Sequence, residues 1–309
     1  MGVMMGKTKF IDIHVHAVRQ HCVDVPLGPN GQRLNVYAEP EELIELYDML
    51  DIEKGILLPE VSPECIPQTV SNEEILAICA DYPDRFVPGC NIDPRNYFNN
   101  SQSPFADGLR RYKDKGCRIL GEICPSLRMT DDRVQALFKA AEEVDIPILF
   151  HLAPFVDDTY GLADLPGLPG LEKSLQRYPK LKVFGHSQAF WCEMAPYNGQ
   201  SVRSGYPSGK IVEEGRIQEL MRKYPNLYGD LSAGSGYNAL ARDREYAAKF
   251  LTEFQDRLFF ATDICSPEMA RKKPHDLGAL LRDMAAKGEI SMETYEKVAA
   301  GNARRVLGI

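Results

Sequence analysis

Histidine and acidic residues recur at the ends of short apolar runs in this sequence of 309 residues. The first run contains His14 and His16, and two imidazoles at this spacing can chelate one divalent ion. The ends of later runs supply four further candidate ligands, which are Glu122, His151, His186 and Asp263. Imidazole and carboxylate suit zinc best, and manganese and iron also use them. The pattern therefore predicts a site for one or two divalent ions, with zinc as the expected metal.

Eight apolar runs without helical periodicity are the candidate strands that would position these ligands. They cover residues 9–16, 54–58, 86–91, 117–122, 147–151, 182–186, 226–230 and 258–263. Amphipathic segments separate them and carry helix-start signals, such as the capping box at 71–74 and the acidic pair after Thr130. Eight successive strand–helix units can close into a (β/α)8 barrel. An open doubly wound sheet is the alternative, which we disfavour because no glycine-rich nucleotide-binding loop follows any run.

We therefore predict an α/β fold, a (β/α)8 TIM barrel, formed by one domain over residues 1–309. Two connections are longer than the rest, at 17–40 and 187–210, and follow the first and sixth strands. Connections after the strands of a barrel line the active-site face. We expect both insertions to form lids or walls of a substrate pocket.

Parallel strands of a barrel end at one face, so ligands at their ends should converge there. Four of the six histidines occupy such ends, whereas His21 and His275 look like ordinary surface residues. Alternation along the first strand places Asp12 on the face of His14 and His16 and turns the intervening apolar residues towards the helices. We expect Asp12 to accept a hydrogen bond from an imidazole N–H.

Composition narrows the class of protein and its partners. The 36 basic and 44 acidic residues give a net charge of −8, which excludes a typical nucleic-acid binder. The eight cysteines form no C-x-x-C pair, as expected of reduced thiols. No apolar stretch approaches the ~20 residues of a membrane span, and the first residues do not resemble a secretory signal. We expect a cytoplasmic protein that contacts neither membrane nor nucleic acid.

The ligand set resembles that of the amidohydrolase superfamily of metal-dependent barrels, and the resemblance spans essentially the whole chain. The segment 131–151 and the closing segment 301–307 are similar to a branch that includes both hydrolases and aromatic-acid decarboxylases. Many superfamily hydrolases carry a carbamylated lysine on the fourth strand, where this chain has Gly121 and Glu122. A glutamate there resembles the TatD-like hydrolases, in which it bridges two metals. The resemblance also implies a small-molecule substrate and possible association into homo-oligomers.

Two reactions fit this resemblance. The first is hydrolysis of an amide, ester or related bond by a metal-activated water, with Asp263 shuttling the proton. In this reading His14, His16 and Asp263 hold one ion, His151 and His186 hold a second, and Glu122 bridges them.

The alternative is decarboxylation of a small aromatic or unsaturated acid. One ion would then be held by His14, His16, His151 and Asp263, leaving His186 as a catalytic acid–base residue. A loop arginine should neutralise the substrate, and the candidates are Arg19, Arg95, Arg128 and Arg203. A metal-binding barrel without activity is disfavoured, because a structural site closes with four ligands and this chain offers five or six.

Overall fold

The computed structural model describes residues 8–21, 37–64, 68–156, 160–197, 203–266 and 277–309, in which strands alternate with helices. The strands are β1 (Phe10–Val15), β2 (Ile52–Leu57), β3 (Phe86–Pro88), β4 (Leu120–Ile123), β5 (Leu127–Arg128), β6 (Ile148–Ala153), β7 (Leu162–Ala163), β8 (Val183–His186), β9 (Leu227–Asp230) and β10 (Leu258–Phe259). The helices are α1 (Pro40–Leu50), α2 (Asn72–Asp81), α3 (Phe105–Asp114), α4 (Asp132–Val144), α5 (Pro169–Arg177), α6 (Gln188–Cys192), α7 (Arg216–Lys223), α8 (Ala233–Ala241), α9 (Arg244–Glu253), α11 (Leu277–Ala286) and α12 (Met292–Glu296), followed by two π-helical turns, η1 (Lys297–Gly301) and η2 (Ala303–Leu307).

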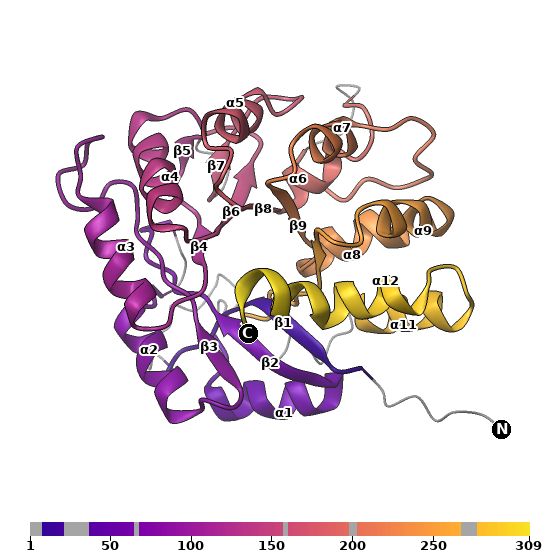
Figure 1. The fold of residues 1–309 in the computed structure, drawn as a ribbon, viewed down its shortest axis with the longest axis horizontal. Coiled ribbons are helices and arrows are strands. Elements are labelled where there is room, and N and C mark those ends of the chain that lie inside the picture. Colours follow the sequence, from indigo (N-terminus) through magenta and orange to yellow (C-terminus); the bar gives the residue numbers. More distant parts are fainter. Residues whose placement is uncertain (1–7, 22–36, 65–67, 157–159, 198–202, 267–276) are drawn as a thin grey trace, which may run out of the picture.

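Parallel pairing arranges the strands as an α/β barrel. One sheet has the order β1-β2-β3, and the other runs from β10 through β9 and β8 to β6, which also pairs with β4. Parallel bridges from Cys90 to Leu120 and from Val15 to Ile264 join the two sheets on both sides. Figure 1 shows the helices surrounding the strands. The predicted barrel is confirmed, and each of the eight predicted strands has a counterpart.

The strands β5 and β7 were not predicted, because two residues are too few to show a pattern. They pair with each other, and β7 also pairs with the end of β6. Together they extend the sheet beyond the point where β4 ends.

The barrel interior is filled by apolar side chains, to which every one of its eight strands contributes. They are Ile11, Ile13, Ile56, Leu58, Val87, Ile119, Leu149, Phe184, Tyr228, Phe259 and Ala261. Ala300, Ala303 and Leu307 at the C-terminal end pack into the same cluster and close one end of the barrel. A larger apolar layer separates the strands from the helices. Burial on both faces explains why the strands read as nearly continuous apolar runs.

The prediction of which β1 side chains face the barrel interior and which face the helices was wrong in part. Ile11 and Ile13 lie inside the barrel, not against the helices, and Asp12 points outward to Tyr47 of α1. The register of β1 against β2 is irregular between Asp12 and Val15. An irregularity of this kind adds a residue to one strand and re-aims the side chains beyond it. It allows His14 to turn into the barrel immediately after Ile13.

The helix-start signals mark the correct helix ends, but α2 shows only the Ser71 half of the expected capping box, and the cap of α4 is Asp131 and not Thr130. Ser71 Oγ accepts a hydrogen bond from the backbone N–H of Glu74 at 3.1 Å, at the start of α2. Asp131 accepts one from the backbone N–H of Arg133 at 2.9 Å, at the start of α4. These caps satisfy donors that the first helical turn leaves free.

Some residues for which the sequence made predictions lie outside the described part of the chain. These are His275, two of the cysteines (Cys22 and Cys65), residues 22–36 of the first insertion and residues 198–202 of the second. Within the part of the chain that the structure describes, all six cysteines are free thiols. No helix in that part has the length and apolar character needed to cross a membrane.

Candidate metal centre

The six predicted ligands lie together where the barrel strands end. His14 lies in β1 and His16 follows directly after it, Glu122 lies in β4, His151 in β6 and His186 in β8, and Asp263 follows β10. His14 Nε2 lies 3.1 Å from His16 Nε2 and 3.3 Å from Glu122 Oε2. Asp263 Oδ1 lies 3.5 Å from both of these imidazole nitrogens. We call these four side chains the first cluster.

A second cluster adjoins the first through Glu122. It consists of Glu122, His151 and His186. The Glu122 Oε1 atom lies 2.8 Å from His151 Nδ1 and 3.7 Å from His186 Nε2. His151 and His186 are direct partners in the register of β6 and β8. Glu122 therefore directs one carboxylate oxygen towards each pair of histidines.

The backbone around Glu122 explains how it reaches this position. Gly121 packs so closely on β6 that an added Cβ would lie 2.7 Å from the Leu149 carbonyl oxygen. The register between β4 and β6 is irregular between Leu120 and Ile123. Asn91 donates a hydrogen bond from Nδ2 to the Glu122 carbonyl at 2.5 Å. These contacts hold the carboxylate inside the barrel.

Hydrogen bonds behind the imidazoles orient their rings. His14 Nδ1 lies 2.7 Å from Asp230 Oδ2, and His16 Nδ1 lies 3.1 Å from the Leu58 carbonyl oxygen. His186 Nδ1 lies 2.9 Å from Ser232 Oγ, which itself donates to Asp230 Oδ2 at 2.9 Å. Each partner can accept a hydrogen bond, so each Nδ1 can keep its proton and leave Nε2 to face the centre as a metal ligand.

This donor set fits a cation. Two imidazole nitrogens 3.1 Å apart, with carboxylate oxygens at 3.3 to 3.6 Å, repel one another unless protons or a metal ion lie between them. Ligand atoms about 2.0–2.1 Å from a tetrahedral ion lie roughly 3.4 Å from one another, which is the spacing of the first cluster. The first cluster therefore fits one divalent ion, and the second offers three further candidate ligand side chains around Glu122.

The electrostatics lead to the same conclusion. Burial lowers the pKa of His16, but the carboxylates of Glu60 and Asp263 outweigh it and raise that pKa to about 10. Burial raises the pKa of Glu122, yet His14 holds it well below its usual value. The carboxylates therefore stay ionised, and the site favours a positive charge among them.

Asp263 is the member of this constellation that faces the barrel mouth. Its side chain is 17% exposed, whereas those of the other five are 8% exposed or less. Its backbone adopts φ 56, a left-handed conformation that is uncommon outside glycine and is often found at functional sites.

Asp230, and not Asp12, is the carboxylate that lies within hydrogen-bond distance of an imidazole N–H, so the prediction for Asp12 was wrong. Asp12 accepts from the Tyr47 hydroxyl at 2.9 Å and the Thr262 hydroxyl at 2.5 Å, and from none of the five imidazoles that the structure describes. No role was predicted for Asp230 or Ser232. Alternation could have found Asp230, because it lies two residues beyond Tyr228, a barrel-interior residue at the end of a predicted strand.

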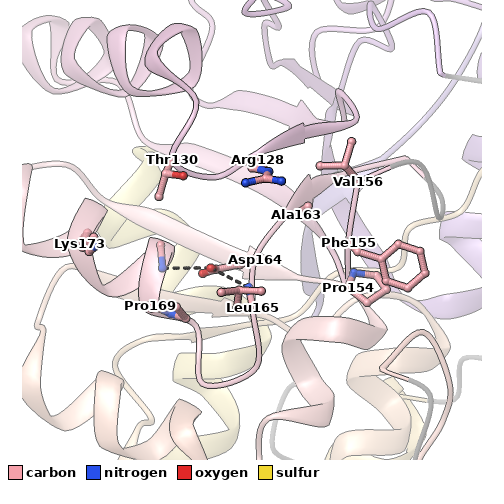
Figure 2. Close-up of a pocket in the computed structure, with 11 residues that line it drawn as sticks. Arg128, Thr130, Pro154, Phe155, Val156, Ala163, Asp164, Leu165, Pro169 and Lys173 are labelled. Atoms are coloured by element: carbon pink, nitrogen blue, oxygen red, sulfur yellow. Dashed lines mark hydrogen bonds between the residues drawn. The ribbon is translucent and has the colours of Figure 1, made fainter.

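Three of the four loop arginines have partners away from the cluster. Arg19 pairs with Asp81, and Arg95 pairs with Asp93 and Glu64. Arg203 is buried and donates to the Asp164 carbonyl at 2.7 Å. Arg128 instead lines a cavity next to the barrel, which Figure 2 shows.

We expect Asp230→Asn to weaken metal binding about 10- to 100-fold, the usual effect of losing the partner of a metal-binding histidine. Both carboxylate oxygens accept in the wild type: Oδ2 from His14 and the Ser232 hydroxyl, and Oδ1 from the Ser232 backbone N–H at 2.9 Å. An amide turns one of these oxygens into an NH2 donor that faces another donor, so the orientation of the rings is disturbed. Competition with a chromophoric chelator measures the affinity. Asp243→Asn is the control, because Asp243 caps α9 and does not contact the cluster. Equal affinity in Asp230→Asn and the wild type would contradict this role.

A family model described as "Amidohydrolase" matches residues 11–309 of this chain. No curated protein matches it in sequence.

Solved structures share its fold at low sequence identity. An uncharacterized TIM-barrel protein from Bordetella bronchiseptica is 19% identical with a TM-score of 0.62, over 97% of this chain and 98% of that one. A protein described as a probable 2-pyrone-4,6-dicarboxylic acid hydrolase from Acinetobacter baumannii is 13% identical with a TM-score of 0.56, over 97% and 100%. A 5-carboxyvanillate decarboxylase from Novosphingobium aromaticivorans, with bound manganese, is 17% identical with a TM-score of 0.55, over 86% and 80%.

Proposed function

This chain belongs to the amidohydrolase family, and from that premise we propose that it is a hydrolase with two divalent ions, acting on an amide, ester or related bond of a small molecule. The observation that carries the proposal is the position of Glu122, whose two oxygens point to different pairs of histidines. A carboxylate shared in this way is typical of a two-metal site.

The first ion would be held by His14, His16 and Asp263, and the second by His151 and His186, with Glu122 between them. Zinc suits this set of imidazoles and carboxylates. Divalent ions at these positions would lower the pKa of water and polarise the bond to be cleaved.

Asp263 is the proton carrier in this proposal. Burial raises its pKa, but His14 outweighs this and holds the pKa below its usual value, so the carboxylate is ionised and can accept a proton. Its exposed position allows it to take that proton from water and return it to the leaving amine or alkoxide. Burial lowers the pKa of His186, which keeps this ring neutral and its Nε2 available as a ligand.

Metal content per chain tests the proposal. We expect about two ions in the wild-type protein and about one in Glu122→Ala, because the variant loses the shared ligand. Glu193→Ala is the control, since Glu193 is buried and pairs with Arg203 away from the clusters. One ion in the wild type, unchanged by Glu122→Ala, would overturn the two-metal proposal.

Decarboxylation is the second candidate, and the network behind His186 favours it. His186, Ser232 and Asp230 form a chain of hydrogen bonds through which a proton could be delivered to carbon. The decarboxylase and the hydrolase among the similar structures both carry names of carboxylic-acid substrates. Assays should therefore compare ester or lactone hydrolysis with CO2 release from aromatic acids. CO2 release without hydrolysis would favour the second candidate.

A further inference from the structure

A cavity of about 470 Å³ is formed by residues of α2 and α3, two helices that Figure 1 shows on the outside of the strands. We call it the helix groove. Its lining consists of Glu73 of α2, Tyr97 in the segment before α3, and Gly108, Arg111, Tyr112, Asp114 and Lys115 along α3 and at its end. Cavities of this size hold small molecules. None of the six candidate metal ligands lines the groove, so it is separate from the metal centre.

The groove exists because one face of α3 has no side chain at residue 108. Gly108, Arg111, Tyr112 and Lys115 follow the helical repeat and share this face. A Cβ added to Gly108 would lie 2.5 Å from the Tyr97 hydroxyl oxygen. Tyr97 itself has φ 64, a left-handed conformation that is uncommon outside glycine and often found at functional sites. The glycine therefore lets the Tyr97 ring lie against the helix as one wall of the groove.

Two cationic side chains reach the groove from successive turns of α3. Arg111 and Lys115 are four residues apart, which places their Cβ atoms about 5–6 Å from each other, so both can contact one carboxylate. In the part of the chain that the structure describes, no hydrogen bond or ion pair involves the Arg111 side chain. Lys115 Nζ lies 6.0 Å from the centre of the Tyr112 ring. A guanidinium with a neighbouring ammonium matches a carboxylate.

Two acidic side chains balance these cations. Glu73 Oε1 accepts a hydrogen bond from the Tyr112 hydroxyl at 3.0 Å, and no other described side chain pairs with this carboxylate. Asp114 adds a second carboxylate to the lining. An inorganic anion would be repelled by the acids, and a simple cation by Arg111 and Lys115. A ligand with both charges on neighbouring atoms, as in an α-amino acid, is complementary to the whole lining.

The groove also offers an apolar surface. Tyr97 is 54% exposed, although its ring lies against α3. Covering an aromatic ring is favourable, and a second ring can stack on it or meet its edge. An amino acid with an aromatic or large apolar side chain would gain this contact, whereas glycine would not.

We propose that the helix groove binds a free aromatic or large apolar amino acid as a zwitterion. Its carboxylate lies on Arg111 and Lys115, its ammonium on Glu73, and its side chain against Tyr97. Occupation of this groove does not depend on the reaction performed at the metal centre.

Isothermal titration of the metal-loaded protein with L-phenylalanine tests the proposal. We expect one molecule to bind per chain. Phenethylamine lacks the carboxylate and N-acetyl-L-phenylalanine lacks the ammonium. Each should bind about tenfold or more weakly, because each leaves one set of charged hydrogen bonds unmade.

Matched variants locate the binding. Arg111→Gln and Glu73→Gln should each weaken L-phenylalanine binding about tenfold or more, and both positions are exposed, so the replacements leave the core intact. Arg110→Gln is the control. Arg110 precedes Arg111 on α3 but pairs with Asp107 and Glu143 and does not line the groove, so this variant should keep the wild-type affinity.

Three outcomes would overturn the proposal. The first is no binding of L-phenylalanine by the wild type. The second is equal affinity for phenethylamine or N-acetyl-L-phenylalanine, because one of the charges would then contribute nothing. The third is unchanged affinity in Arg111→Gln, which would place the amino acid elsewhere, for example on the metal ions. The titration requires no turnover, so failure here leaves the proposed hydrolase untouched.

Discussion

Asp263→Asn should lower kcat about 10²- to 10⁴-fold, the range that a positioned acid–base group contributes. The amide oxygen can still lie near His14 and His16, but an amide neither accepts a proton from water nor returns one to a leaving group. The measurement is kcat on whichever substrate the assays identify, together with metal content. Loss of activity with metal retained is the expected combination.

The control for this prediction is Asp145→Asn. Asp145 ends α4 on the surface, so its replacement should leave kcat unchanged. If Asp263→Asn keeps its metal and its activity within a factor of about ten, Asp263 is not the proton carrier.

Removal of the metal should destabilise the protein by about 4 kcal/mol for each ion lost, if the wild type is compared at a free metal concentration of roughly 1,000 times Kd. The physical reason is that only the folded chain brings His14 Nε2 and His16 Nε2 to 3.1 Å from each other beside two carboxylates, so the ion binds the folded state and not the unfolded one. Unfolding in urea with and without a chelator measures the difference, and added zinc should restore it.

The variant His16→Ala provides the control for the chelator. It removes one ligand of the first cluster and leaves the second cluster intact, so the chelator should change its stability less than that of the wild type. An equal chelator effect in both proteins would place the stabilising ion elsewhere. No chelator effect in the wild type would contradict the metal centre itself.

The barrel and the six converging side chains could be predicted from the sequence for a simple reason. Burial on both faces makes each barrel strand a recognisable apolar run, and parallel strands bring their C-terminal ends to one face. A ligand at the end of such a run, such as His151 or His186, therefore lies near the others whatever the details of packing. His186 and His151 are in fact direct partners in register.

Only the tertiary structure decided how each ligand is aimed. Alternation predicts faces correctly along a regular strand, but β1 and β4 are irregular near His14 and Glu122. The partner of His14 is Asp230, 216 positions away, and closure of the barrel brings them together. The helix groove likewise depends on the contact of Tyr97 with Gly108, which no local pattern shows. The sequence determined the fold and the ligand types because local periodicity encodes burial, whereas the orientation of each ligand depends on contacts between distant strands.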